Sequence, residues 1–298
     1  MASNKYEVLE GDIKKVSKKL KKNSVQVIIT SPPYFKLRHY SKDKYLAAEE
    51  IGREKSVDDY VSDLVAIFHS LKDVLKDDGL LWLNLGDTYI NKELQGIPWR
   101  VALALMQDGW ILRSDVIWQK PNAMPSSVTS RPTTDHEYVF MFSKAKDYYY
   151  DADAIREPHI TFTSKSKMKG GRKHFGKVNG TPEKGKNGGN SNLHNGRWDQ
   201  AFNPKGRNKR TVWSIPLSKF RGAHFAVFPK KLVEIPLKAS TKIGDLVLDP
   251  FTGSGTTGVV AKEYGRSFIG VELEPEYVKM AQDRIDAAKL TVENTSLF

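Results

Sequence analysis

A turn of two prolines and a tyrosine follows a short β-branched run near the start of the chain. Residues 25–29 form that run, which predicts a buried parallel strand, and Ser31, Pro32, Pro33 and Tyr34 come directly after it. Because prolines cannot continue a strand ladder, they predict a stiff turn at the carboxyl edge of a sheet, where α/β proteins bind ligands. A rigid turn suits a site that holds a planar ring. Packing alone is the alternative role for Tyr34.

A glycine-rich turn lies near the other end of the chain. Residues 253–258 have the pattern G-x-G-x-x-G between a predicted strand at 246–249 and a predicted helix at 256–264. Such glycines permit a tight turn and close approach of a ligand, and Glu272 ends the next strand, where a carboxylate can bind ribose hydroxyls. The pattern predicts a nucleotide-like ligand. The P-loop lysine is absent, so NAD and S-adenosylmethionine are the candidates, and a plain turn is the alternative.

Positive charge is concentrated in one block of the sequence. The net charge is +12, and residues 161–222 hold 15 Lys and Arg against only Glu183 and Asp199. Aromatic residues are interleaved with the basic ones, and apolar periodicity is missing over residues 163–210. A solvated insertion is one interpretation of this composition. A segment that binds a polyanion is the interpretation we favour.

Composition excludes several classes of protein. The 298 residues include no cysteine, which excludes disulfides, thiolate zinc sites and a cysteine nucleophile, and we expect no metal site. No apolar run is long enough to span a membrane, and the first residues do not resemble a secretory signal. We therefore expect a cytoplasmic, nucleoid-associated protein with no membrane partner.

Strands and helices alternate on both sides of the basic block. This alternation predicts an α/β fold with a mostly parallel sheet. Apolar runs predict strands at residues 25–29, 80–85, 110–118, 137–142, 246–249 and 267–272. Helical spacing predicts helices from Ser56 to Gly79, at 98–107, at 230–240 with an interruption at Pro236, at 256–264 and at 275–290.

Taken together, these motifs resemble those of the amino-group DNA methyltransferases, which methylate N4 of cytosine or N6 of adenine. Residues 30–34 resemble the catalytic motif, 249–257 the S-adenosylmethionine motif, and 224–229 the segment that precedes it. Residues 118–122 and 134–138 are similar to motifs beside the target-base pocket. The catalytic motif comes before the cofactor motif, which is similar to the permuted β group of the family.

The resemblance implies a Rossmann-like S-adenosylmethionine-dependent methyltransferase fold. In this fold a mostly parallel sheet has helices on both faces, in circularly permuted motif order, with a basic recognition insert. We expect residues 1–160 to form the catalytic half of one methyltransferase domain and residues 223–298 its cofactor-binding half. Residues 161–222 would be the target-recognition insert between them.

The resemblance also implies roles for individual residues. Ser31 Oγ and the Pro32 carbonyl would accept the two hydrogens of the target amino group, with Pro33 fixing the turn and Tyr34 stacking on the base. The expected cofactor-binding residues are Asp12, Phe225, Ala226, Phe228, Asp249, Phe251, Gly253, Ser254, Gly255, Thr256 and Glu272. The expected DNA-binding residues are Arg172, Lys173, Arg197, Arg207, Lys209 and Arg210.

Ser31 decides which target base we favour. Serine at the first motif position is typical of the N4-cytosine enzymes of the family, so we expect methyl transfer from S-adenosylmethionine to N4 of a cytosine flipped out of duplex DNA. Methylation of cytosine C5 would need a cysteine. The alternative is N6-adenine, and an RNA methyltransferase, an inactive DNA-binding protein and an NAD-dependent oxidoreductase are remote alternatives. Expected partners are duplex DNA and a restriction endonuclease acting on the same site, with the protein a monomer or homodimer.

Overall fold

The computed structural model describes residues 4–37, 50–160, 203, 205–217 and 228–291. The chain divides into two compact units. One unit combines Met1–Asp151 with Arg210–Phe298, and the other is Ala152–Lys209. Among the residues that the structure describes, no helix is long and apolar enough to cross a membrane.

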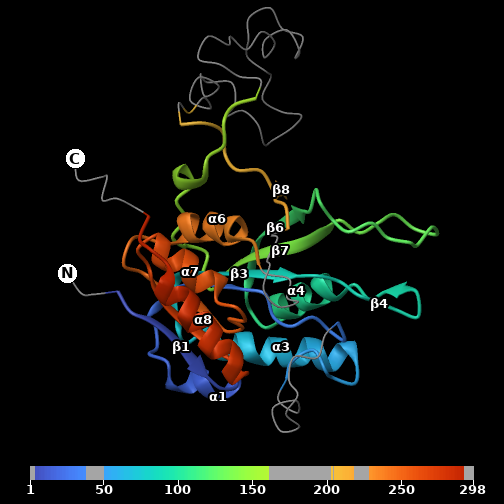
Figure 1. The fold of residues 1–298 in the computed structure, drawn as a ribbon, viewed down its shortest axis with the longest axis horizontal. Coiled ribbons are helices and arrows are strands. Elements are labelled where there is room, and N and C mark those ends of the chain that lie inside the picture. The colour runs from blue at the N-terminus through green and yellow to red at the C-terminus, as the bar shows by residue number, and fades with distance from the viewer. Residues whose placement is uncertain (1–3, 38–49, 161–202, 204, 218–227, 292–298) are drawn as a thin grey trace, which may run out of the picture. The chain divides into compact units, whose positions relative to one another are not determined.

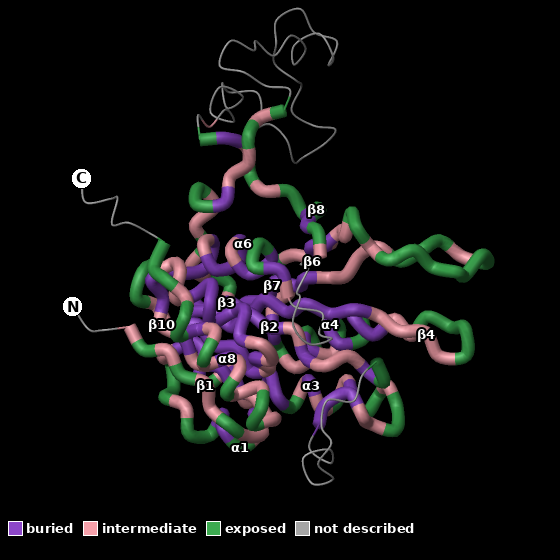
Figure 2. Tube along the Cα trace, viewed as in Figure 1, coloured by how far each residue is buried: buried purple, intermediate pink, exposed green. Residues whose placement is uncertain are grey.

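The first unit is built on an eight-stranded sheet, and Figure 2 shows its central strands buried. Every neighbouring pair of strands is parallel except the two pairs made by β7, which runs antiparallel to β3 and β6. The mostly parallel sheet is therefore confirmed. In spatial order the strands are β1 (Tyr6–Glu10), β10 (Ser267–Glu272), β9 (Leu246–Asp249), β2 (Val25–Thr30), β3 (Leu75–Leu85), β7 (His136–Ser143), β6 (Ile111–Gln119) and β8 (Val212–Ser214).

Helices cover both faces of this sheet, as expected (Figure 1). Successive strand residues point to opposite faces, and Leu81 and Leu83 of β3 share a hydrophobic core with residues of α1, α3 and α4. Trp82, between them, donates to Ser240 of α6 at 2.8 Å, so α6 covers the other face with α7 and α8. The helices are α1 (Ile13–Val16), α3 (Val57–Leu71), α4 (Ile97–Gln107), α6 (Lys230–Ser240), α7 (Thr256–Glu263) and α8 (Pro275–Ala287).

Several short elements complete the described chain. Two strands, β4 (Tyr89–Ile90) and β5 (Glu93–Leu94), form an antiparallel hairpin after β3. Turns of 3-10 helix are formed at Ser17–Lys19 and Asp153–Ile155. The sequence patterns predicted neither β1 nor β8, because one is short and half-exposed and the other is only three residues long.

Two helix predictions are wrong, one in where the helix ends and one in a break within the helix, and the final helix ends at Ala287 instead of residue 290. The helix that begins after Ser56 ends at Leu71 and does not continue to Gly79, because Leu75 already begins β3. Leu75 keeps helical spacing from Leu71 by coincidence, and both side chains are fully buried. The predicted interruption at Pro236 is also wrong, since α6 is one piece. A proline there removes a single backbone hydrogen bond, and burial of the helix offsets that loss.

The second unit is described only where its two ends meet. Glu157 and Arg207 form an antiparallel bridge, with N–H donated in each direction at 3.0 and 2.9 Å. A Cβ on Gly206 would lie 2.4 Å from the Glu157 carbonyl oxygen, so glycine permits this close approach. The unit, residues 152–209, is shifted from the expected insert at 161–222. Residues 212–214 form β8 and so belong to the sheet.

Candidate active site

The order of the strands brings the predicted motifs to one edge of the sheet. From β9 the chain continues to β10 on one side, and from β2 it continues to β3 on the other. The carboxyl ends of β9 and β2 therefore form a topological switch point, where open α/β sheets bind ligands. Because β7 is antiparallel, its first residues, His136 and Glu137, lie at this edge. They lie beside Gln119, at the end of β6.

Asp249 holds the switch point together. Its carboxylate oxygens accept hydrogen bonds from the hydroxyls of Thr30 and Thr257, both at 2.7 Å, and from the Phe251 N–H at 3.1 Å. Burial raises the pKa of Asp249 to about 6, against the effect of these three donors. The carboxylate thus fixes β2, β9 and α7 to one another. Its expected contact with a cofactor stays a prediction.

The glycine-rich turn forms a loop between β9 and α7. Gly255 precedes α7 with φ +79°, and a Cβ at this position would lie 2.9 Å from Ala281 of α8. Gly253 also has positive φ, but no atom of a described residue lies within 4 Å of the point its Cβ would occupy. The Gly253 N–H donates to Glu272 Oε2 at 2.7 Å. As far as the described residues go, the loop is therefore closed against α8 at Gly255 and open at Gly253.

Two carboxylates stand at the ends of the neighbouring strands β10 and β1. Glu272 accepts three backbone N–H groups, from Gly253, Leu273 and Glu274, and burial raises its pKa against the effect of these bonds. Asp12 follows β1 by two residues and caps α1 by accepting from the Lys14 N–H at 2.9 Å. Because Glu10 pairs with Glu272 in the sheet, Asp12 lies close to the same edge.

These groups fit a nucleoside ligand that carries an amino-acid end. Ribose hydroxyls need a carboxylate acceptor, which Glu272 provides. The Thr256 hydroxyl is buried in the first turn of α7 without a hydrogen-bond partner among the described residues. A helix N-terminus favours negative charge, so this end suits the carboxylate of the ligand. Phe251, Ser254 and Phe228 are half-buried, and Phe225 and Ala226 lie outside the described residues.

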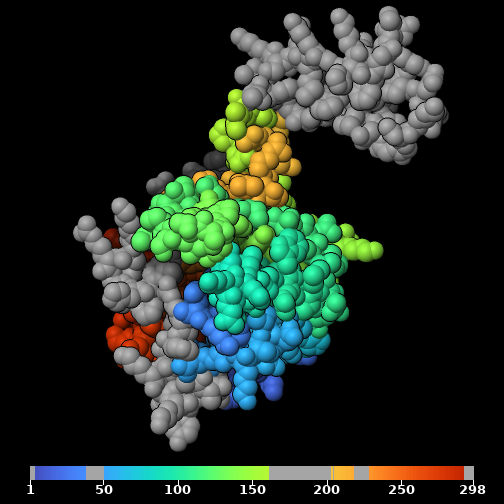
Figure 3. Space-filling model, turned by 90° about the vertical axis from the view of Figure 1, so that its right-hand side faces the viewer, coloured from blue at the N-terminus to red at the C-terminus, as the bar shows by residue number. Residues whose placement is uncertain are grey.

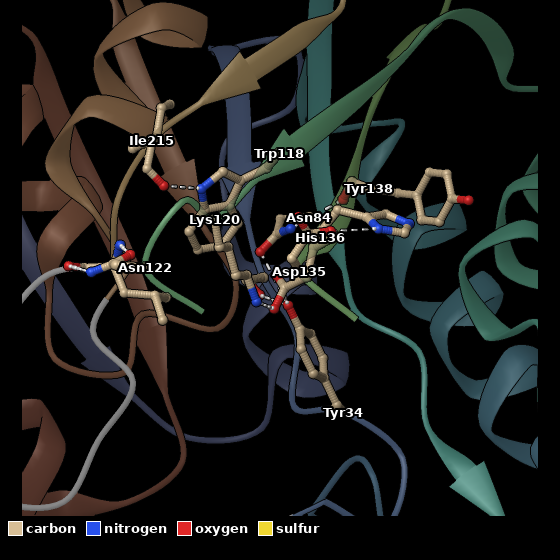
Figure 4. Close-up of polar contacts among 12 residues, drawn as sticks. Tyr34, Asn84, Trp118, Lys120, Asn122, Asp135, His136, Tyr138 and Ile215 are labelled. Carbon is tan, nitrogen blue, oxygen red and sulfur yellow. Dashed lines mark hydrogen bonds and ion pairs between the residues drawn. The ribbon is translucent and has the colours of Figure 1, made fainter. Parts of the chain in front are cut away.

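On the other side of the switch point, Tyr34 is held by its hydroxyl (Figure 4). Its oxygen lies 2.7 Å from Glu137 Oε2 and 3.1 Å from Asn84 Oδ1, and it accepts from Ser31 Oγ at 3.2 Å. Lys120 forms an ion pair with the other oxygen of Glu137. Burial, with the nearby Glu137 charge, raises the pKa of Tyr34 well above its usual range. The tyrosine is therefore a neutral donor at ordinary pH.

The turn that carries Ser31 is joined to α3 by a hydrogen bond. The Pro33 carbonyl accepts from the Tyr60 hydroxyl of α3 at 2.9 Å, which leaves Pro33 occupied and Pro32 as the expected acceptor for substrate. A Cβ on Gly86 would lie 2.6 Å from the Tyr34 ring, so glycine after β3 lets the ring lie against the chain. Figure 3 shows blue residues from the N-terminal part of the chain at the surface, below green residues from the middle of the chain.

Comparison with known proteins decides the family. A family model described as DNA methylase, of N6 and N4 type, matches residues 25–283. The chain belongs to this family. A Type II methyltransferase of Citrobacter freundii, M.Cfr9I, is 40% identical over 96% of this chain and 89% of its own length. M.SmaI of Serratia marcescens is 37% identical over 93% of this chain and 90% of its own length.

Solved structures share the fold of this methyltransferase. The PvuII DNA methyltransferase, described as cytosine-N4-specific, superposes with a TM-score of 0.66 at 21% identity and covers 99% of this chain and 89% of that one. A DNA modification methylase of Thermus thermophilus, solved with S-adenosyl-L-methionine, gives 0.60 at 22% identity, with 94% of each chain covered. The Rossmann-like fold is thus confirmed and, together with membership of the DNA methylase family, so is S-adenosylmethionine as the cofactor.

Sequence reasoning did not assign the polar partners of Tyr34. Lys120 and Glu137 fall within the motifs named beside the base pocket, but neither residue received a role there. The third partner, Asn84, is an amide within the apolar strand β3, which is a usable signal in the sequence. Asp87, two residues after β3, caps the loop before α4, since it accepts the N–H groups of Gly96 and Ile97.

The expected DNA-binding residues of the methyltransferase separate into two groups. Arg172, Lys173 and Arg197 lie outside the described residues. Arg207 and Lys209 both pair with Glu157, at 3.0 and 3.2 Å, and Arg210 is exposed. Their contact with phosphates or bases stays a prediction, and for Arg207 and Lys209 it would compete with an existing ion pair.

Proposed function

We propose that this DNA methyltransferase transfers a methyl group from S-adenosylmethionine to the exocyclic N4 of a cytosine flipped out of duplex DNA. One observation carries the proposal. The 2.7 Å hydrogen bond from Thr30 to Asp249 joins the residue before Ser31 to the strand that leads into the cofactor loop. This bond supports the proposal, because the expected acceptors for the target amino group and the expected cofactor loop then lie at one switch point.

The contribution of this chain to the reaction is to orient the target amino group and the methyl group. The sulfonium of S-adenosylmethionine supplies an activated methyl group, whereas the amino nitrogen of cytosine is a weak nucleophile, since its lone pair is delocalised into the ring. Ser31 Oγ and the Pro32 carbonyl would accept the two amino hydrogens and favour tetrahedral geometry at nitrogen. Fixed polar groups of this kind lower the barrier without reorganising during the reaction.

Two observations associate this chain with enzymes that act on N4 of cytosine and not on adenine. Ser31 at the first motif position is typical of the N4-cytosine enzymes, and the PvuII enzyme, which shares the fold, is described as cytosine-N4-specific. Extruding the base costs a few kcal/mol. Binding of DNA by the basic residues of 161–222 would offset this cost, and that binding would weaken steeply with added salt.

The relatives are Type II methyltransferases, so the proposal extends to a restriction endonuclease that acts on the same site. No direct contact between the two enzymes is required, because the methylated DNA itself is what the endonuclease fails to cut.

The deciding experiment measures transfer of isotope-labelled methyl from S-adenosylmethionine to mixed-sequence duplex DNA, followed by digestion and mass spectrometry of the nucleosides. Labelled N4-methylcytosine is the expected product. Labelled N6-methyladenine would confirm methyl transfer to an amino group but would contradict the assignment of cytosine as the target base. An absence of label on duplex DNA, with label on RNA, would overturn the substrate.

A further inference from the structure

The hydrogen bonds around Tyr34 favour one direction. Asn84 Nδ2 donates to the Tyr138 carbonyl at 3.0 Å, so Asn84 must present its oxygen, an acceptor, to the Tyr34 hydroxyl. The Glu137 carboxylate is also an acceptor, and it lies closer, at 2.7 Å. The single hydrogen of the Tyr34 hydroxyl therefore points toward Glu137, and the Tyr34 oxygen accepts from Ser31 Oγ.

This direction determines what Ser31 can offer a substrate. Its own hydrogen is directed to Tyr34, so the lone pairs of Ser31 Oγ are left to accept a hydrogen from a bound amino group. The chain of donors runs from the substrate position through Ser31 and Tyr34 and ends at Glu137. Ser31, Tyr34 and Glu137 come from the turn after β2 and from the start of β7, which the sheet brings to the same edge.

Transfer of a methyl group to an amino nitrogen leaves one proton too many on that nitrogen. As the nitrogen bonds to the methyl carbon, the bond between that carbon and sulfur breaks and its electron pair stays on sulfur. The nitrogen then carries a positive charge until it loses a proton. A group that receives this proton without exposing the site to water would assist the step.

We propose that Glu137 is the proton acceptor for methyl transfer, reached through Ser31 and Tyr34. The substrate proton passes to Ser31 Oγ, the Ser31 proton to the Tyr34 oxygen, and the Tyr34 proton to Glu137 Oε2. Both hydroxyls are restored, and Glu137 ends as a carboxylic acid that later returns the proton to solvent. This inference rests on the proposed function only in requiring an exocyclic amino substrate, and it holds for cytosine and adenine alike.

Among the described residues, a lysine and a tyrosine contact the Glu137 carboxylate. Lys120, just after β6, pairs with its second oxygen, and Tyr34 faces its first oxygen. Asp135 and His136, just before it in the chain, pair with each other at 3.6 Å. Tyr34 itself stays protonated, since its pKa is raised, so it passes a proton on without holding a negative charge.

The main test replaces Glu137 with glutamine, which still accepts a hydrogen bond from Tyr34 but cannot take its proton. Single-turnover methyl transfer should fall about 100-fold or more, while affinities for S-adenosylmethionine and DNA stay within twofold. The loss should therefore appear in the transfer rate and not in either affinity. A variant within threefold of the wild-type rate would overturn the proposal.

A matched control is Glu263→Gln. Glu263 is as buried as Glu137, with its side chain 17% exposed against 14%, and it also pairs with a lysine, Lys230. It lies at the end of α7, before β10, and so at the opposite edge of the sheet. Its substitution should leave the rate unchanged, which separates loss of a buried ion pair from loss of the proton acceptor.

A second variant tests the relay at its middle. Tyr34→Phe keeps the ring but removes the hydroxyl, so it should be slowed to a similar extent as Glu137→Gln. The double variant should be no slower than either single variant, because both interrupt one path. Multiplied losses would show independent roles and overturn the relay. Label on adenine in place of cytosine would leave this inference intact, whereas no transfer by the wild type to either base would overturn both proposals.

Discussion

The two sides of the switch point are built by different means. On the cofactor side, most of the contacts that fix the site are made by backbone N–H groups. Those of Gly253, Leu273 and Glu274 all donate to Glu272. On the base side, side chains from β3, β7 and the turn after β2 meet at one tyrosine hydroxyl, and Lys120, just after β6, pairs with the β7 carboxylate. The first arrangement depends on backbone shape and the second on residue identity. Substitutions should therefore affect binding on one side and turnover on the other.

Loss of backbone shape on the cofactor side should have the largest effect. Gly255→Leu places a side chain where φ is +79° and where a Cβ would lie 2.9 Å from Ala281, so the loop and α8 must separate. Calorimetry should detect no binding of S-adenosylmethionine. Gly244→Leu is the control, since Gly244 also has positive φ but open space around its Cβ position, and it should bind normally. Unchanged binding by Gly255→Leu would contradict the loop assignment.

Removal of the basic segment should leave both sides of the site in place and abolish the preference for a specific DNA sequence. Replacement of residues 161–202 by a short Gly/Ser linker keeps the Glu157–Arg207 bridge. Preference for specific over non-specific DNA, typically about 10³-fold or more, should disappear, and the salt dependence of binding should weaken. Competition binding at several salt concentrations measures both, with cofactor affinity as the control. A variant that still methylates the same sites would show that sequence is read elsewhere.

A change of residue identity on the base side should slow turnover alone. Ser31→Ala removes an acceptor for the target amino group, and the rate should fall about 100-fold, the effect typical of losing one fixed polar group. Affinity for S-adenosylmethionine, measured by calorimetry, should be unchanged because Ser31 makes no described contact with the glycine loop. If cofactor binding were lost as well, the turn would have a structural role and the two sides would not be separable.

Asp249 joins the two sides, and its substitution should change stability more than rate. Its raised pKa of about 6 means that the folded protein holds this proton more tightly than the unfolded chain, whose ordinary value is 3.8. The free energy of unfolding should therefore decrease as pH rises from about 4 to about 7, by about 3 kcal/mol from this group. Urea unfolding of Asp249→Asn should lack this contribution. Parallel pH profiles for the two proteins would contradict it.

The cofactor side could be predicted from sequence because its signals are local. The boundaries of β9 and β10 were predicted to the residue, and the glycine loop and Glu272 follow from them. The base side could be predicted only at Ser31 and its turn. Asn84, Lys120 and Glu137 are far apart in sequence, and only the antiparallel placement of β7 brings Glu137 to the carboxyl edge. The spacing of residues along the sequence does not indicate that β7 runs antiparallel to its neighbours.

The errors in the fold have related causes. Leu75 continues a helical pattern although it lies in a strand, because burial on both faces of β3 hides the period of two. Strand β8 lies within a basic sequence whose composition conceals it. There Trp118 and Trp213 occupy facing positions on neighbouring strands, and the indole of Trp118 donates to the Ile215 carbonyl at 2.8 Å. Long-range pairing decided both cases.

The bridge between Glu157 and Arg207 has a consequence for how such an enzyme changes over evolutionary time. A segment that leaves and returns at one paired point can be lengthened or replaced at nearly constant cost, since loop-closure entropy grows only slowly with length. Genetic recombination at these two positions would exchange one DNA-recognition segment for another and leave the residues of the active site unchanged. The bridge thus marks a boundary at which new sequence preferences can be acquired as a cassette.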